Sequence, residues 1–121
     1  MVDCNNFILG NQDGEIGIKE KIDIGDIYEY VTIMLEDSYQ FIKLCAPEAI
    51  ENIRIVQACL IDEDVVNIEV GIESGKESDD DIIFYQSICD EEECFRIFED
   101  FFLKKFKPDM SEYEPVQYLT G

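Results

Sequence analysis

The chain has 121 residues, with 29 acidic side chains against nine basic ones and no histidine, so its formal net charge is −20. A charge of this size repels polyanions, and we therefore expect no direct binding to nucleic acid or to an anionic membrane. Hydrophobic residues make up 46% of the chain and aromatic residues 12%, which is more apolar bulk than a disordered acidic segment carries. We expect a single folded domain over residues 1–121.

The sequence favours a cytoplasmic protein. No run approaches the roughly 20 apolar residues that a membrane-spanning helix needs, and residues 1–10 lack the basic region and apolar core of a signal peptide. The five cysteines are odd in number and have no paired spacing, which argues against a secreted disulfide framework. Most of these cysteines are expected to be small core residues.

The first predicted element is a β-hairpin. Residues 7–9 are apolar, and the Asp13-Gly14 pair that follows is typical of a tight hairpin turn. Residues 16–22 then alternate between apolar and largely basic positions, which predicts a second strand.

The next segment favours a helix. Apolar residues recur at helical spacing over 27–45 with polar residues on the opposite face, and Asp26 is placed to cap this helix. Pro47 is expected to end it and to open a short helical connector. The β-branched and aromatic content leaves a second interpretation open, with two strands over 27–35 and 39–45.

Three strands are predicted next. Residues 53–61 and 65–72 form an antiparallel hairpin around the acidic turn 62–64, and the alternating polarity of the second strand indicates one solvent-exposed face. A polar loop over 74–81 leads to a third strand over 82–88.

The last predicted element is an aromatic-rich helix. Asp90 with Glu93 forms a variant capping box, and acidic residues fill the first turn. Three lysines after the aromatic stripe complement the helix dipole, and Pro108 is expected to stop the helix. The tail 109–121 carries Tyr113, Val116, Tyr118 and Leu119, with which it can pack back onto the domain.

Together these elements predict an α+β fold in the order ββαβββα, with a mainly antiparallel sheet of about five strands packed against two α-helices. One face of that sheet is then partly exposed and polar, which makes it a candidate binding surface.

No motif in the chain predicts catalysis. Without histidine, the commonest general base and metal ligand are missing, and no glycine-rich phosphate loop or paired zinc spacing occurs. Three acidic runs (62–64, 79–81 and 90–93) could collect a hard cation, but none has the alternating ligands of a calcium loop. We therefore expect a protein that is not an enzyme and has no cofactor and no metal site.

The placement of the acidic residues suggests a binding surface. Between Leu60 and Phe102 there are fifteen acidic residues and two basic ones. In the expected topology the 62–64 turn lies at one end of the three strands, and the 73–81 loop and the helix start at 90–93 lie together at the other. A negative patch there would steer a basic partner. Tyrosine is enriched at interfaces, and the candidate set for this surface is Asp62, Glu63, Asp64, Asp79, Asp80, Asp81, Tyr85, Glu91 and Glu92.

This profile resembles the small acidic immunity proteins of bacterial toxin–immunity systems, including contact-dependent inhibition and other polymorphic toxins. The segments that carry the resemblance are the hairpin NIRIVQACLIDEDVVNIEVGI, the strand DIIFYQSI and the helix DEEECFRIFEDFF. The resemblance implies that the chain occludes a basic toxin, such as a nuclease domain, with carboxylates where the toxin expects phosphates. It implies that the residues placed on that surface are Asp79, Asp80, Asp81, Glu91 and Glu92.

Two other function classes stay open. A phage-type inhibitor, or nucleic-acid mimic directed at a host nuclease, would use the same carboxylates against a different partner. An acidic calcium-binding module is the other class, and saturable calcium binding would distinguish it. The sequence does not determine the oligomeric state.

Overall fold

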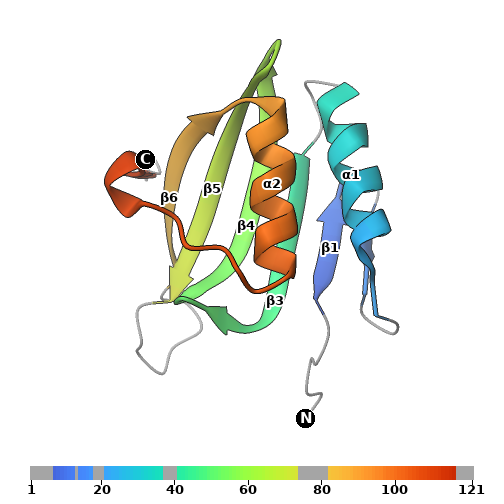
Figure 1. Cartoon of the computed structure of the whole chain (residues 1–121), viewed down its shortest axis with the longest axis horizontal. Helices are drawn as coiled ribbons and strands as arrows, with labels where there is room; N and C mark the ends of the chain where they lie inside the picture. The colour runs from blue at the N-terminus through green and yellow to red at the C-terminus, as the bar shows by residue number, and fades with distance from the viewer. Residues whose placement is uncertain (1–6, 13, 18–20, 37–40, 74–81, 117–121) are drawn as a thin grey trace, which may run out of the picture.

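The computed structural model describes residues 7–12, 14–17, 21–36, 41–73 and 82–116. Within them, seven antiparallel strands form one sheet, and two helices cover one of its faces (Figure 1). The strand order across the sheet is β2-β1-β3-β4-β5-β6-β7. The predicted α+β class is confirmed, with seven strands instead of about five.

The elements in chain order are β1 (Ile8–Asn11), β2 (Gly14–Ile16), α1 (Ile24–Glu36), β3 (Phe41–Ile50), β4 (Ile53–Asp62), β5 (Val65–Glu73), β6 (Ile82–Cys89), α2 (Glu91–Phe102), the 3-10 helix η1 (Met110–Glu112) and β7 (Glu114–Pro115).

The first hairpin forms as predicted but its second strand is short. Asn11 pairs with Gly14 across the turn, and β2 ends at Ile16. Gly17 follows with φ +99°, and a Cβ there would lie 2.2 Å from the Phe7 carbonyl oxygen, so only glycine fits. The predicted strand over 16–22 is therefore wrong at Gly17 and at residues 21–22, and residues 18–20 lie outside the described part of the chain.

Helix α1 begins earlier than predicted, through a reciprocal cap. The Asp26 amide donates to Asp23 Oδ1 at 3.0 Å, and the Asp23 amide donates to Asp26 Oδ2 at 2.9 Å. The expectation that Asp26 is the cap was wrong: Asp23 caps the first turn, and Asp26 reaches back to it from inside the helix.

The predicted helix over 27–45 is wrong from Phe41 onward, where the chain forms the strand β3, and residues 37–40 lie outside the described part of the chain. Ile42, Leu44 and Ala46 alternate along β3 and are buried under the helices. β3 pairs with β1 on one side and β4 on the other, and this pairing outweighs the helical spacing. Pro47 lies within β3, at a register shift between Cys45 and Ile50, so the expected helical connector does not form.

The hydrophobic core lies between the helices and the inner face of the sheet. Phe98 and Phe101 of α2 are fully buried, and Phe101 makes edge-on ring contacts with Phe7 and Phe106 at centroid distances of 6.0 and 6.4 Å. α2 ends at Phe102, and Lys104 has a left-handed φ of 62°. Pro108 therefore does not stop the helix, and the three lysines at 104, 105 and 107 follow the helix instead of lying in its last turn.

Residues 113–116 of the C-terminal segment pack onto the sheet. β7 extends the sheet beyond β6, with Gln86 opposite Glu114, and Tyr113 is half-buried against the core. Tyr118 and Leu119 lie outside the described residues.

The cysteines depart from the expected core placement. Among the four described cysteines, all of them free, Cys94 is buried and Cys45, Cys59 and Cys89 are half-buried; Cys4 lies outside the described residues.

Neither described helix is long and apolar enough to cross a membrane.

Candidate functional site

An acidic surface forms at the end of the sheet where β4 turns into β5. The strands β4, β5 and β6 are antiparallel, so β6 runs in the direction of β4 and delivers the start of α2 to the same end as the 62–64 turn (Figure 1). The pairing of Val66 with Cys89 fixes this proximity. The expectation that the 90–93 helix start lies at the opposite end, with the 73–81 loop, was therefore wrong.

A hydrogen bond ties the turn to the helix. Asp64 Oδ1 accepts the backbone N–H of Glu91 at 3.0 Å, across 27 residues of sequence. Asp64 itself has φ +55°, a conformation that Asp tolerates better than most residues. Asp90 Oδ1 accepts the Glu93 N–H at 2.8 Å and caps α2, as the sequence predicted.

We call the resulting surface the acidic end. It comprises seven carboxylates: Asp62, Glu63, Asp64, Asp90, Glu91, Glu92 and Glu93. Arg96 pairs with Glu93 at its margin, and this contact raises the pKa of the guanidinium.

The structure brings together only part of the predicted site. Asp62, Glu63, Asp64, Glu91 and Glu92 share the acidic end, whereas Asp79, Asp80 and Asp81 lie outside the described residues. Tyr85 does not join them: it lies along β6 opposite Val70, faces the helix side of the sheet and packs against the core.

Asp90 and Glu93 belong to the 90–93 helix start that was expected in the negative patch, but the candidate set did not include them. The signal that could have placed them was the parity of the strands. The 62–64 turn follows β4. The next two antiparallel strands, β5 and β6, run away from that end of the sheet and back to it, so α2 begins beside the turn.

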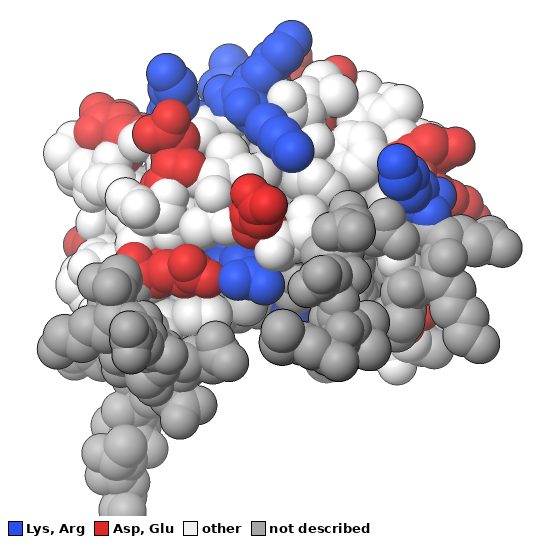
Figure 2. Space-filling view, turned by 90° about the horizontal axis from the view of Figure 1, so that it is seen from below, with Lys and Arg blue, Asp and Glu red and all other residues white. Residues whose placement is uncertain are grey.

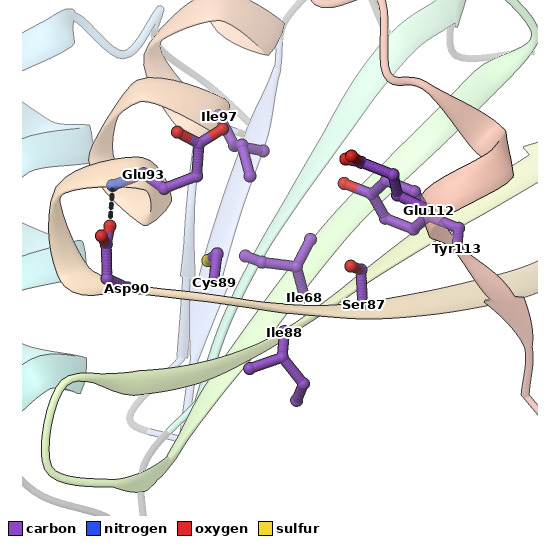
Figure 3. Close-up of a pocket in the computed structure, with 9 residues that line it drawn as sticks. All are labelled: Ile68, Ser87, Ile88, Cys89, Asp90, Glu93, Ile97, Glu112 and Tyr113. Carbon is purple, nitrogen blue, oxygen red and sulfur yellow. Dashed lines mark hydrogen bonds between the residues drawn. The ribbon is translucent and has the colours of Figure 1, made fainter.

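A cleft of about 260 Å³ adjoins the acidic end, between α2, β6 and the η1 segment (Figure 3). Figure 3 shows Glu93 of α2 and Glu112 of η1 on opposite sides of this hollow, with Ser87 and Cys89 of β6 along its base and Ile88 pointing away on the other side of the strand. Carboxylates and hydroxyls around a partly apolar base can accept an ammonium or guanidinium group.

Tyr113, which lines the cleft, and Cys94, which lies beside Cys89, have raised pKa values. Burial raises the pKa of Tyr113 to about 12, with further contributions from the negative charges of Cys89, Glu93 and Glu112. A hydrogen bond with Cys89, together with burial, raises the pKa of the Cys94 thiol. A thiol held protonated in this way is not an activated nucleophile. Among the described residues, no group of three or more Cys, Asp or Glu side chains is arranged to hold a metal ion.

The opposite end of the molecule carries mixed charge. Figure 2 views that end from below and shows Lys and Arg side chains among Asp and Glu. α2 ends there, followed by the exposed Lys104, and Arg54 bonds Glu73 at 2.8 Å. Among the described residues, carboxylates therefore gather at the acidic end, whereas the opposite end mixes both signs of charge.

The sheet face away from the helices is only partly polar. One polar row crosses five strands in register, formed by Lys43, Gln57, Glu69, Gln86 and Glu114. The row on its far side is mainly apolar, and consists of Ile8, Cys45, Ile55, Gly71 and Phe84. The expectation of a polar open face therefore holds for the central row and fails beside it.

Comparisons of the chain with protein-family models, with curated proteins and with solved structures found no match in any of the three.

Proposed function

We propose that this chain is a non-catalytic cytoplasmic binding protein that neutralises a basic protein partner, in the manner of the immunity proteins of bacterial toxin systems. The acidic end meets the cationic surface of the partner, for which a nuclease domain is the best candidate, and occludes it. The protein contributes charge and shape and carries out no reaction of its own.

The hydrogen bond between Asp64 and the Glu91 amide carries this proposal. A flexible acidic tail would lose conformational entropy on binding, whereas two acidic segments fixed to each other and to the sheet present their carboxylates already in place. Such a preorganised negative surface accelerates association with a cationic partner and suppresses binding to anionic ones.

The adjoining cleft supports the same role. Its acidic rim, formed by Asp90, Glu93 and Glu112, extends the negative surface down one side of α2. A Lys or Arg side chain of the partner can enter this cleft and bond its carboxylates, which adds specificity to long-range attraction.

The test uses two variants of equal net charge. Glu63→Gln/Glu92→Gln removes two exposed carboxylates from the acidic end and leaves the caps Asp64 and Asp90 in place. Glu48→Gln/Glu51→Gln removes two exposed carboxylates from β3 and the β3–β4 turn and serves as the matched control.

The partner is captured on the immobilised chain at low salt, identified by mass spectrometry, purified and measured by surface plasmon resonance. We expect a basic protein whose activity is lost in the complex, and an association rate lowered roughly fivefold by the acidic-end variant but not by the control. If both variants lowered the association rate equally, net charge alone, and not the position of the carboxylates, would determine association, which would contradict the role of the acidic end. A captured protein that keeps its activity while bound would contradict neutralisation.

A further inference from the structure

An uncharged row of side chains, with an exposed apolar residue at each end and half-buried residues between them, lies on the open sheet face next to the acidic end. Phe41, Cys59, Asn67 and Ile88 are in register across β3, β4, β5 and β6, and this set is called the apolar row below. Phe41 is 44% exposed and Ile88 57% exposed, and no residue of the row is charged. In a chain with 29 acidic residues, an uncharged strip of four strands with large exposed apolar groups at both ends is typical of an interface core.

A hollow beside Phe41 gives this row the shape of a docking site. It has a volume of about 130 Å³ and is lined by Phe41, Gln57, Ala58, Cys59 and Glu69. Gln57 Nε2 donates to Glu69 Oε1 at 3.1 Å, so the charged group at its edge is hydrogen-bonded within the sheet. Burial, and then the negative charge of Glu69, raise the pKa of the Cys59 thiol, which keeps it neutral. The hollow therefore suits an apolar side chain.

The row and the acidic end are continuous. Ile88 precedes the cap Asp90 by two residues on β6, and Cys59 precedes Asp62 by three residues on β4. A partner that covers one surface therefore lies against the other. Charge complementarity selects a partner with cationic groups opposite the acidic end and apolar side chains opposite the row. A second copy of this chain would bring two acidic ends and a total charge of −40 together, which disfavours that occupant.

We infer that the apolar row and the hollow beside Phe41 are the apolar half of the docking surface for the basic partner, which inserts an apolar side chain there while its cationic groups contact the acidic end. This inference rests on the proposed function, because it assigns a second contact to the same partner.

Two synthetic probes separate the two contacts. One is an oligolysine, which carries charge alone, and the other is an amphipathic helical peptide of lysine and leucine with the same number of charges. Amide chemical shifts of the isotope-labelled full chain are followed by NMR as each probe is added. We expect oligolysine to shift the amides of residues 62–64 and 90–93, and the Lys/Leu peptide to shift in addition those of the apolar row.

Three single substitutions then test the row by dissociation constant. Phe41→Ser and Ile88→Ser remove exposed apolar side chains from it, and Ile83→Ser is the matched control on the same strand, since Ile83 is 50% exposed and faces the other side of the sheet. We expect the first two substitutions to raise the dissociation constant of the Lys/Leu peptide roughly fivefold and to leave that of oligolysine unchanged. The control should alter neither probe, and thermal melting verifies that all three variants fold.

The outcomes distinguish the two proposals. If both probes bind at the acidic end but Ile88→Ser, Phe41→Ser and Ile83→Ser behave alike, the apolar row is not a docking surface, and the proposed function stands. If neither probe binds, the acidic end itself fails and this inference fails with it. A wild-type dimer in light scattering that Ile88→Ser converts to a monomer would assign the row to a second copy and overturn the inference.

Discussion

Substitution of Asp64 tests whether the acidic end is held together as a unit. Its carboxylate accepts the Glu91 N–H at 3.0 Å, and its backbone has φ +55°. Loss of a carboxylate that bonds a helix N-terminal amide costs about 1 kcal/mol, as for a lost N-cap. An alanine in a left-handed conformation costs about 1 kcal/mol more.

Three variants separate these contributions. Asp64→Asn keeps an acceptor oxygen and tolerates the positive φ, so we expect a loss of at most about 0.5 kcal/mol, from the weaker interaction with the helix dipole. Asp64→Gly loses the hydrogen bond alone, at about 1 kcal/mol, and Asp64→Ala loses both, at about 2 kcal/mol. At about 4 °C per kcal/mol for a domain of this size, the Ala variant should melt about 8 °C below the wild type.

The assay is urea and thermal unfolding followed by circular dichroism. The geometry requires the free energy of unfolding to decrease in the order wild type, Asn, Gly, Ala. An Ala variant within about 0.3 kcal/mol of the Asn variant would refute both the bond to Glu91 and the left-handed turn.

Two further predictions concern charge and pH. Because the net charge of −20 repels itself, the melting temperature should rise as NaCl increases from about 0.01 M to about 0.15 M, and a flat or falling response in differential scanning calorimetry would contradict this. Tyr113 has its pKa raised from 10.0 to about 12 in the folded state, so its contribution to stability is complete below pH 10.0 and is lost as the pH rises through about 12. Across this pH window, the free energy of unfolding measured in urea should fall less steeply for Tyr113→Phe than for the wild type. Parallel pH dependences of the two proteins would show that the phenol titrates normally.

Much of the second half of the fold could be predicted from the sequence. The alternation in β5 and the Asp90 cap of α2 are local signals, and the structure has both. β3 could not be identified in this way. Its apolar residues fit a helical period as well as a strand, and the choice depends on pairing with β1 and β4. The end of α2 was also missed, because the left-handed Lys104 has no sequence signature comparable to Pro108.

The candidate site, like the fold, could be predicted from the sequence only in part. The acidic residues at 62–64 and 90–93 could be selected from their clustering, since charge is visible in composition. Their position at one end of the sheet could have been inferred from the two predicted antiparallel strands between them, but the Asp64–Glu91 bond that joins them has no sequence signal. The apolar row was invisible for a related reason: Phe41 had been placed in a helix, and its exposure depends on which face of β3 the helices cover.

The sequence by itself determined the strong acidity of this protein, its capacity to form a core and the lack of histidine-based chemistry, because these follow from residue types alone. The tertiary structure decided where the acidic residues lie. Antiparallel pairing of β4, β5 and β6 carries the two acidic segments to one end of the sheet, and the helices cover only one sheet face, which leaves Phe41 and Ile88 exposed beside that end. Strand direction and layer packing are properties of the whole chain, and no local pattern of residues specifies them.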